Sequence, residues 1–196
     1  MDSGNDRERC NRSLRHHELK IGRFLPIWST YGTSVRMSKS REELLSAMGP
    51  AKALTLGCYG EDMAAYCYLQ LAEKAEREQD RREFSEMVAE EQEHRDRLRT
   101  LLDKHYPGSD FVLSPEEKQI VEGGARSLNI TNRRSFEEAV RGVVASEAMT
   151  ARFYRQMERH IDQPEVKAVF SELADEGVTH HKRLLQLASE NNIDIP

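Results

Sequence analysis

The sequence predicts an all-α protein, an antiparallel four-helix bundle with one long crossover. Charged residues make up 32% of its 196 residues, against 38% hydrophobic and 7% aromatic, a balance typical of soluble helical proteins. Its 11 glycines and 6 prolines are too few for a turn-dense β-sandwich. Four long segments with helical periodicity also follow Gly49, in two pairs with short links. The length fits one compact domain.

The first pair of long helices is bounded by proline, aspartate and a Tyr-Pro-Gly stop. Pro50 occupies a first-turn position, and the first helix is expected from Ala51 to about Glu78. Asp80 is expected to cap the second, which runs from Arg81 to about His105. Because so few residues link the two helices, they must fold back on each other as an antiparallel hairpin.

A second hairpin follows a long connection that runs from Tyr106 to Arg134. Inside that connection, Ser114 and Glu117 predict the start of a short helix. Ser135, with Glu138 three residues later, predicts the start of the third long helix, which ends near His160. The fourth is expected from Pro164 to about Glu190. A connection of this length can cross the whole bundle and place the second hairpin beside the first.

Charge divides the chain into a basic extension, residues 1–40, and an acidic body, residues 41–196. The extension carries eight Lys or Arg and four Asp or Glu, which leaves a net charge of −9 on the body. A disordered leader and an arm that docks on an acidic surface both fit the extension. The body is expected to open with a short amphipathic helix, Arg41–Met48. An acidic body argues against nucleic acid as the main partner.

Two further features indicate a cytoplasmic protein with no membrane partner. No apolar run approaches the roughly 18 residues that a membrane span needs. The three cysteines include no Cys-x-x-Cys motif, and no secretion signal precedes them, so no disulfide framework is expected.

The two hairpins match each other in a gapless register of 86 positions. Glu61, Phe84 and His94 correspond to Glu147, Phe170 and His180. Several core positions and the triplet Phe-Ser-Glu match in the same register. The sequence therefore predicts an internal duplication with a pseudo-two-fold axis through the bundle.

Polar residues occupy core positions of this pattern. The apolar seams of the four helices include three glutamates and two histidines at about one height, namely Glu61, Glu91, His94, Glu147 and His180. Burying an ionised carboxylate costs several kcal/mol even after relaxation, and two imidazoles cannot neutralise three of them. Two divalent ions can, and mixed oxygen and imidazole ligands suit iron or manganese. Individually satisfied core histidines or a relic site remain the alternatives.

These motifs resemble a known family. Glu61-x-x-Ala64-x-x-x-Tyr68 followed by Glu91-x-x-His94, with Glu147 and His180 as the second set, is similar to the ferritin-like superfamily, nearest its rubrerythrin branch. The resemblance covers roughly Ala51 to Glu190. It implies two iron ions held by Glu61, Glu91, His94, Glu147 and His180. Tyr68 and Tyr154 either hydrogen-bond ligating carboxylates or pack in the seam.

The sequence departs from the family pattern at Gly177, where a second bridging glutamate is expected. Glu176 is the nearest substitute ligand; otherwise water, substrate or an oxyanion takes the place, or the site has decayed. The ion near His180 is therefore expected to be held less completely than the ion near His94. His181 is expected at the surface.

The family's four-cysteine rubredoxin site is also missing. Cys10, Cys58 and Cys67 cannot form one, and Cys67 is expected to pack in the core.

The leading functional hypothesis is a di-iron protein that reduces peroxide or dioxygen at its metal pair, oxidises Fe(II) and takes electrons from an external donor. A degenerate ferritin-like scaffold or binding module is the alternative, and an iron-storage ferroxidase is the second. A homodimer is left open.

Overall fold

The structure is a computed structural model that describes residues 40–109, 111–122 and 129–196. These residues form helices and no strands, which confirms the predicted fold class. The helices are α2 (Arg41–Ser46), α3 (Pro50–Lys74), α4 (Glu78–His105), α5 (Pro115–Glu122), α6 (Arg133–His160) and α7 (Pro164–Glu190).

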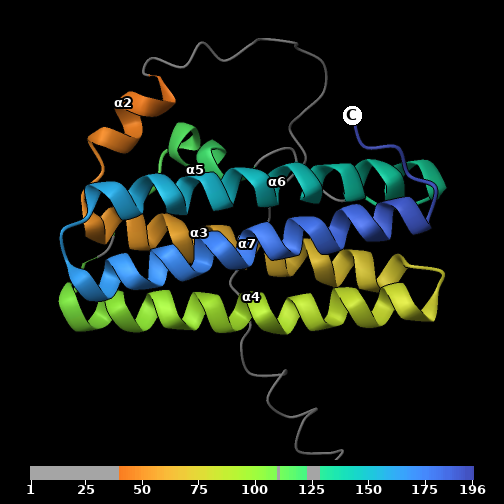
Figure 1. The fold of residues 1–196 in the computed structure, drawn as a ribbon, viewed down its shortest axis with the longest axis horizontal. Coiled ribbons are helices and arrows are strands. Elements are labelled where there is room, and N and C mark those ends of the chain that lie inside the picture. Colours follow the sequence, from red (N-terminus) through yellow and green to blue (C-terminus); the bar gives the residue numbers. More distant parts are fainter. Residues whose placement is uncertain (1–39, 110, 123–128) are drawn as a thin grey trace, which may run out of the picture. The chain divides into compact units, whose positions relative to one another are not determined.

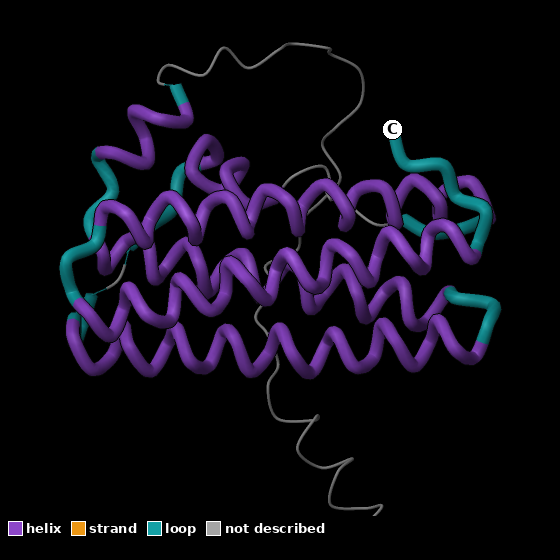
Figure 2. Tube along the Cα trace, viewed as in Figure 1, coloured by secondary structure: helices purple, strands orange, loops and turns teal. Residues whose placement is uncertain are grey.

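The four long helices lie side by side as two antiparallel hairpins (Figures 1 and 2). The most extensive contacts join α3 to α4 and α6 to α7, while α3 also packs on α6 and α4 on α7. Short α5 lies in the long connection and packs against α3 and α6. The bundle with one crossover is therefore as predicted.

Helix ends are where the sequence prediction needs correction. Helix α4 begins at Glu78 with Arg77 as its N-cap, so Asp80 is not the cap; it lies buried in the first turn, 3.8 Å from Arg77 Nε. Helix α6 begins two residues before Ser135, because Asn132 caps it. The Asn132 side chain accepts from Ser135 N and Ser135 Oγ accepts from Asn132 N, each at 3.0 Å. This arrangement satisfies two N–H groups, and the box with Glu138 does not form.

The start of α5 and both ends of α7 agree with the sequence prediction. Ser114 and Glu117 bond each other reciprocally at the start of α5. Helix α7 has the predicted limits. Helix α3, however, ends four residues earlier than expected, at Lys74.

The core consists of two apolar clusters with the polar residues between them. Along α4, Met87 belongs to one cluster and Leu98 to the other, with Glu91 and His94 in the interval. Along α7, Ala174 and Leu184 flank His180 in the same way. The polar layer therefore lies at mid-bundle, closed off by apolar packing at both ends.

The predicted basic extension lies outside the described residues, apart from Ser40, which caps α2. Helix α2 itself ends at Ser46, two residues short of the expected end. Within the described ranges, no helix combines the length and the apolar character that crossing a bilayer requires.

Candidate metal centre

Every long helix contributes to the polar layer. Glu61 comes from α3, Glu91 and His94 from α4, Glu147 from α6 and His180 from α7. Each of the five is at most 8% exposed. The seam spacing that places leucines in the core also turns these side chains inward, so the structure brings together all five residues that the sequence grouped.

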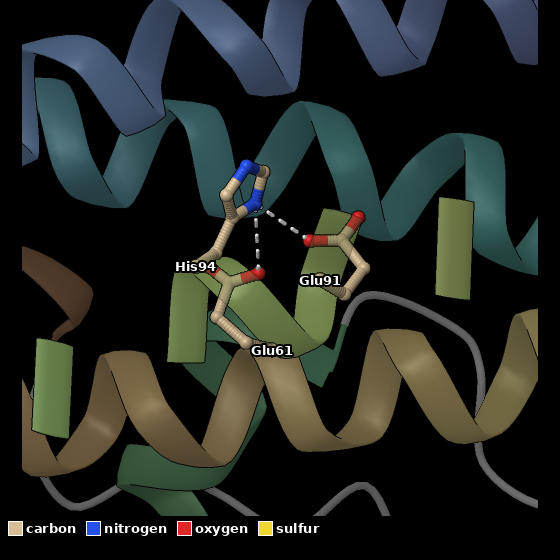
Figure 3. A group of neighbouring side chains, drawn as sticks. All are labelled: Glu61, Glu91 and His94. Carbon is tan, nitrogen blue, oxygen red and sulfur yellow. Dashed lines mark hydrogen bonds and ion pairs between the residues drawn. The ribbon is translucent and has the colours of Figure 1, made fainter. Parts of the chain in front are cut away.

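Two groups of possible ligand atoms share one residue. Glu61, Glu91 and His94 form the first, drawn in Figure 3, where the two carboxylates point toward the His94 ring. Glu91, Glu147 and His180 form the second. His94 Nδ1 lies 3.0 Å from Glu91 Oε2 and 3.7 Å from Glu61 Oε2, while His180 Nδ1 lies 2.8 Å from Glu91 Oε1.

Glu91 therefore gives one oxygen to each group. Both groups contain two carboxylates and one imidazole. The His180 side was expected from the sequence to be held less completely; in the structure Glu91 faces both histidines, so the two groups contain the same number of carboxylates.

The donor set fits a pair of divalent ions. Within each group the possible ligand atoms all lie within 4.8 Å of one another, close enough to surround one ion. Glu91 Oε1 is buried and lies 2.8 Å from His180 Nδ1, so it is paired only while that nitrogen carries a proton. With Nδ1 unprotonated, the oxygen and nitrogen lone pairs face each other and favour a cation between them.

The electrostatics of the layer favour added positive charge. Burial, together with the charge of Glu91, raises the pKa of Glu147 to about 8 and the pKa of Glu61 well above its usual range. Burial alone would lower the pKa of His94, but contacts with Glu61 and Glu91 outweigh it and raise that pKa to about 10. Either protons or metal cations can neutralise the buried carboxylates.

Two tyrosines hold the outer carboxylates. The Tyr68 hydroxyl of α3 donates to Glu147 Oε1 on α6, and the Tyr154 hydroxyl of α6 donates to Glu61 Oε1 on α3. Burial and the neighbouring carboxylates raise the pKa of both phenols well above the usual value, so both stay protonated as donors. Both roles left open by the sequence are observed, because the hydroxyls bond the carboxylates and the rings pack in the apolar clusters.

Gly177 of α7 lies close to Ala151 of α6. A Cβ atom built there would sit 3.2 Å from Ala151 Cβ, tighter than ordinary van der Waals contact. Glu176 does not join the inward atoms, because its Oε2 lies 3.0 Å from the outer nitrogen of His94, Nε2. His181 is half-buried rather than at the surface, with Nδ1 3.0 Å from the Val144 carbonyl oxygen.

Two arginines outside the histidines were missed by the sequence analysis. Arg183 Nη1 lies 2.5 Å from Glu90 Oε2, and Arg97 Nη1 lies 3.5 Å from Glu176 Oε2. Positions 97 and 183, like 90 and 176, match in the register of 86. That correspondence is the signal that could have identified them.

The described cysteines are free. Cys67 is buried in the apolar core as expected, and burial raises the pKa of its thiol to about 12. Cys58 is half-buried, and Cys10 lies outside the described residues.

Comparisons with known proteins agree with this geometry. Residues 52–188 match the family model described as rubrerythrin. The solved structure of a hypothetical protein from Pyrococcus furiosus is similar, with a TM-score of 0.64 and 22% sequence identity. That match covers 75% of this chain and 92% of the other, and at this identity it shows the fold alone. No curated protein matches the chain.

Proposed function

The chain belongs to the rubrerythrin family of the ferritin-like superfamily, and on that basis we propose that it binds two iron ions and reduces peroxide or dioxygen with oxidation of Fe(II). One ion is assigned to Glu61, Glu91 and His94, and the other to Glu91, Glu147 and His180. Manganese suits the same donors.

The sharing of Glu91 is the observation that carries this proposal. Each oxygen of this buried carboxylate faces a different histidine, which supports two ions held side by side by one bridge. Each group offers two oxygens and one nitrogen, so a six-coordinate ion would keep places for a small substrate.

The remaining residues would prepare the site. Iron, when bound, supplies the one-electron chemistry that reduces dioxygen or peroxide. Tyr68 and Tyr154 fix the orientation of Glu147 and Glu61 by donating to one oxygen of each carboxylate. The apolar clusters on either side limit the access of bulk water along the bundle axis.

A separate protein or small molecule is proposed as the electron donor for repeated turnover. The three cysteines of this sequence cannot form a four-cysteine iron site.

The test is a single-turnover reaction with limiting hydrogen peroxide. Protein loaded anaerobically with Fe(II) should oxidise two Fe(II) for each peroxide consumed, faster than free Fe(II) does in the same buffer. The matched control is Glu93→Gln, since Glu93 is exposed and outside both groups. Loaded protein that reacts no faster than free Fe(II) would contradict the redox role.

Gly177 supports a second candidate, a ferritin-like scaffold that has lost its metal chemistry. The close approach of Ala151 leaves a new side chain at position 177 no ordinary space, so the seam has adapted to the missing glutamate. For a scaffold, the purified protein should contain no metal, and added Fe(II) or Mn(II) should not change its melting temperature.

A further inference from the structure

The outer nitrogens of the two histidines each meet a carboxylate from the opposite hairpin. His94 Nε2 on α4 lies 3.0 Å from Glu176 Oε2 on α7, and His180 Nε2 on α7 lies 3.0 Å from Glu90 Oε2 on α4. The two imidazole rings stack between these contacts, with centroids 5.6 Å apart. The orientation of each ring is therefore tied to a side chain of the other hairpin.

Both carboxylates are themselves held by arginines. Arg183 contacts Glu90 at 2.5 Å and also Glu83 at 2.6 Å. Arg97 contacts Glu176 at 3.5 Å and also Glu172. The two histidines line a solvent-facing pocket of about 260 Å³ between α4 and α7, together with Glu90, Glu176, Arg97 and Arg183.

The carboxylate at Nε2 determines which nitrogen of each imidazole carries the hydrogen. A neutral imidazole carries a hydrogen on one nitrogen and a lone pair on the other. An acceptor at Nε2 keeps the hydrogen there and leaves the lone pair on Nδ1. In both histidines Nδ1 is the atom that faces Glu91.

We propose that Glu90 and Glu176 are positioning residues that fix the two histidines with Nδ1 directed at the metal pair, an inference that rests on the proposed metal function. Each acts across the α4–α7 interface on the histidine of the other hairpin. Loss of such an acceptor typically weakens metal binding 10–100-fold. Glu176, which the sequence suggested as a direct ligand, takes this outer role.

Four variants test the proposal: Glu90→Leu and Glu176→Leu remove the acceptor, while Glu90→Gln and Glu176→Gln remove the charge and keep an oxygen that can accept. The control is Glu93→Leu, because Glu93 lines the same pocket and, in the described part of the chain, pairs with neither histidine. Anaerobic Fe(II) binding is measured against a competing chelator, and the visible absorption of bound Co(II) reports its ligand geometry. Melting curves of the metal-free variants establish that each is folded.

Each leucine variant should bind one of its two ions at least 10-fold more weakly and change the Co(II) spectrum. The glutamine variants should retain most of the affinity, and Glu93→Leu should match the wild type. If wild-type protein binds two ions and the leucine variants bind both equally well, this inference alone fails. Glutamine variants as weak as the leucine variants would also overturn it. A wild-type chain that binds no metal removes the proposed function and this inference with it.

Discussion

Replacing Glu91 with glutamine should weaken the binding of both metal ions rather than of one. Glu91 Oε2 lies 3.0 Å from His94 Nδ1 and Oε1 lies 2.8 Å from His180 Nδ1, so the carboxylate belongs to both groups. Glutamine keeps the shape, but it turns one oxygen into an NH₂ group and removes the charge from the bridge. Because changing a partner of a ligand already costs 10–100-fold in affinity, losing the bridge itself should cost at least about 100-fold at each ion.

Matched variants separate the shared residue from the residues that serve one group. Glu61→Gln and Glu147→Gln each alter a single group, so each should weaken one ion and leave the other near wild-type affinity. The assay is anaerobic Fe(II) titration against a chelator, with the exposed Glu93→Gln as control. If Glu91→Gln retains one ion at wild-type affinity, the bridge is not shared and the site has been assigned wrongly.

Stability of the metal-free variant must be measured in the same experiment. Glu91 is the charged partner of both His94 and His180, but burial together with its charge also raises the pKa of Glu61 and Glu147, so its loss removes two attractions and relieves two repulsions in the metal-free fold. Circular dichroism melting sets the temperature below which the titration is run, so that lost metal is not confused with lost fold.

Three further predictions follow from the same geometry. His94→Ala and His180→Ala should release equal amounts of metal; a larger loss from His94→Ala would contradict the equivalence of the two groups. Gly177→Ala should raise the free energy of unfolding by less than the roughly 1 kcal/mol that helix propensity alone predicts, because the new Cβ would lie 3.2 Å from Ala151 Cβ. In an Ala151→Gly background the same substitution should give the full gain. The measurement is urea unfolding of both single variants and the double variant. If the two single changes in unfolding free energy add up to that of the double variant within about 0.3 kcal/mol, the contact is not tight. The melting temperature of metal-free protein should fall as pH rises from about 7 to about 10. With the pKa of His94 raised to about 10 and the pKa of Glu147 raised to about 8, the folded chain binds more protons than the unfolded chain. A melting temperature that rises over this range would refute the assignment.

The architecture could be predicted from the sequence because its signals are local and redundant. Pro164 and the apolar seam of α7 each indicate the same helix. Where two residues compete for one role, local signals were insufficient: both Asn132 and Ser135 can cap a helix, and the observed box uses both. Asp80 is a residue type that often caps helices, but α4 already begins at Glu78.

The membership of the site was also predictable, but its connectivity was not. Seam spacing placed Glu61, Glu91 and His94 inward, since it depends only on helical periodicity. That Glu91 faces both histidines depends on its rotamer and on the distance between helices, which spacing does not encode. The contact between Gly177 and Ala151 likewise depends on how closely α6 and α7 approach.

The metal stoichiometry tests the central claim most directly. Metal-free protein is titrated anaerobically with Fe(II), and bound iron is counted per chain. Two equivalent groups joined by Glu91 predict a break at two ions per chain. A break at one ion would contradict the shared bridge, and no binding would contradict the metal centre itself.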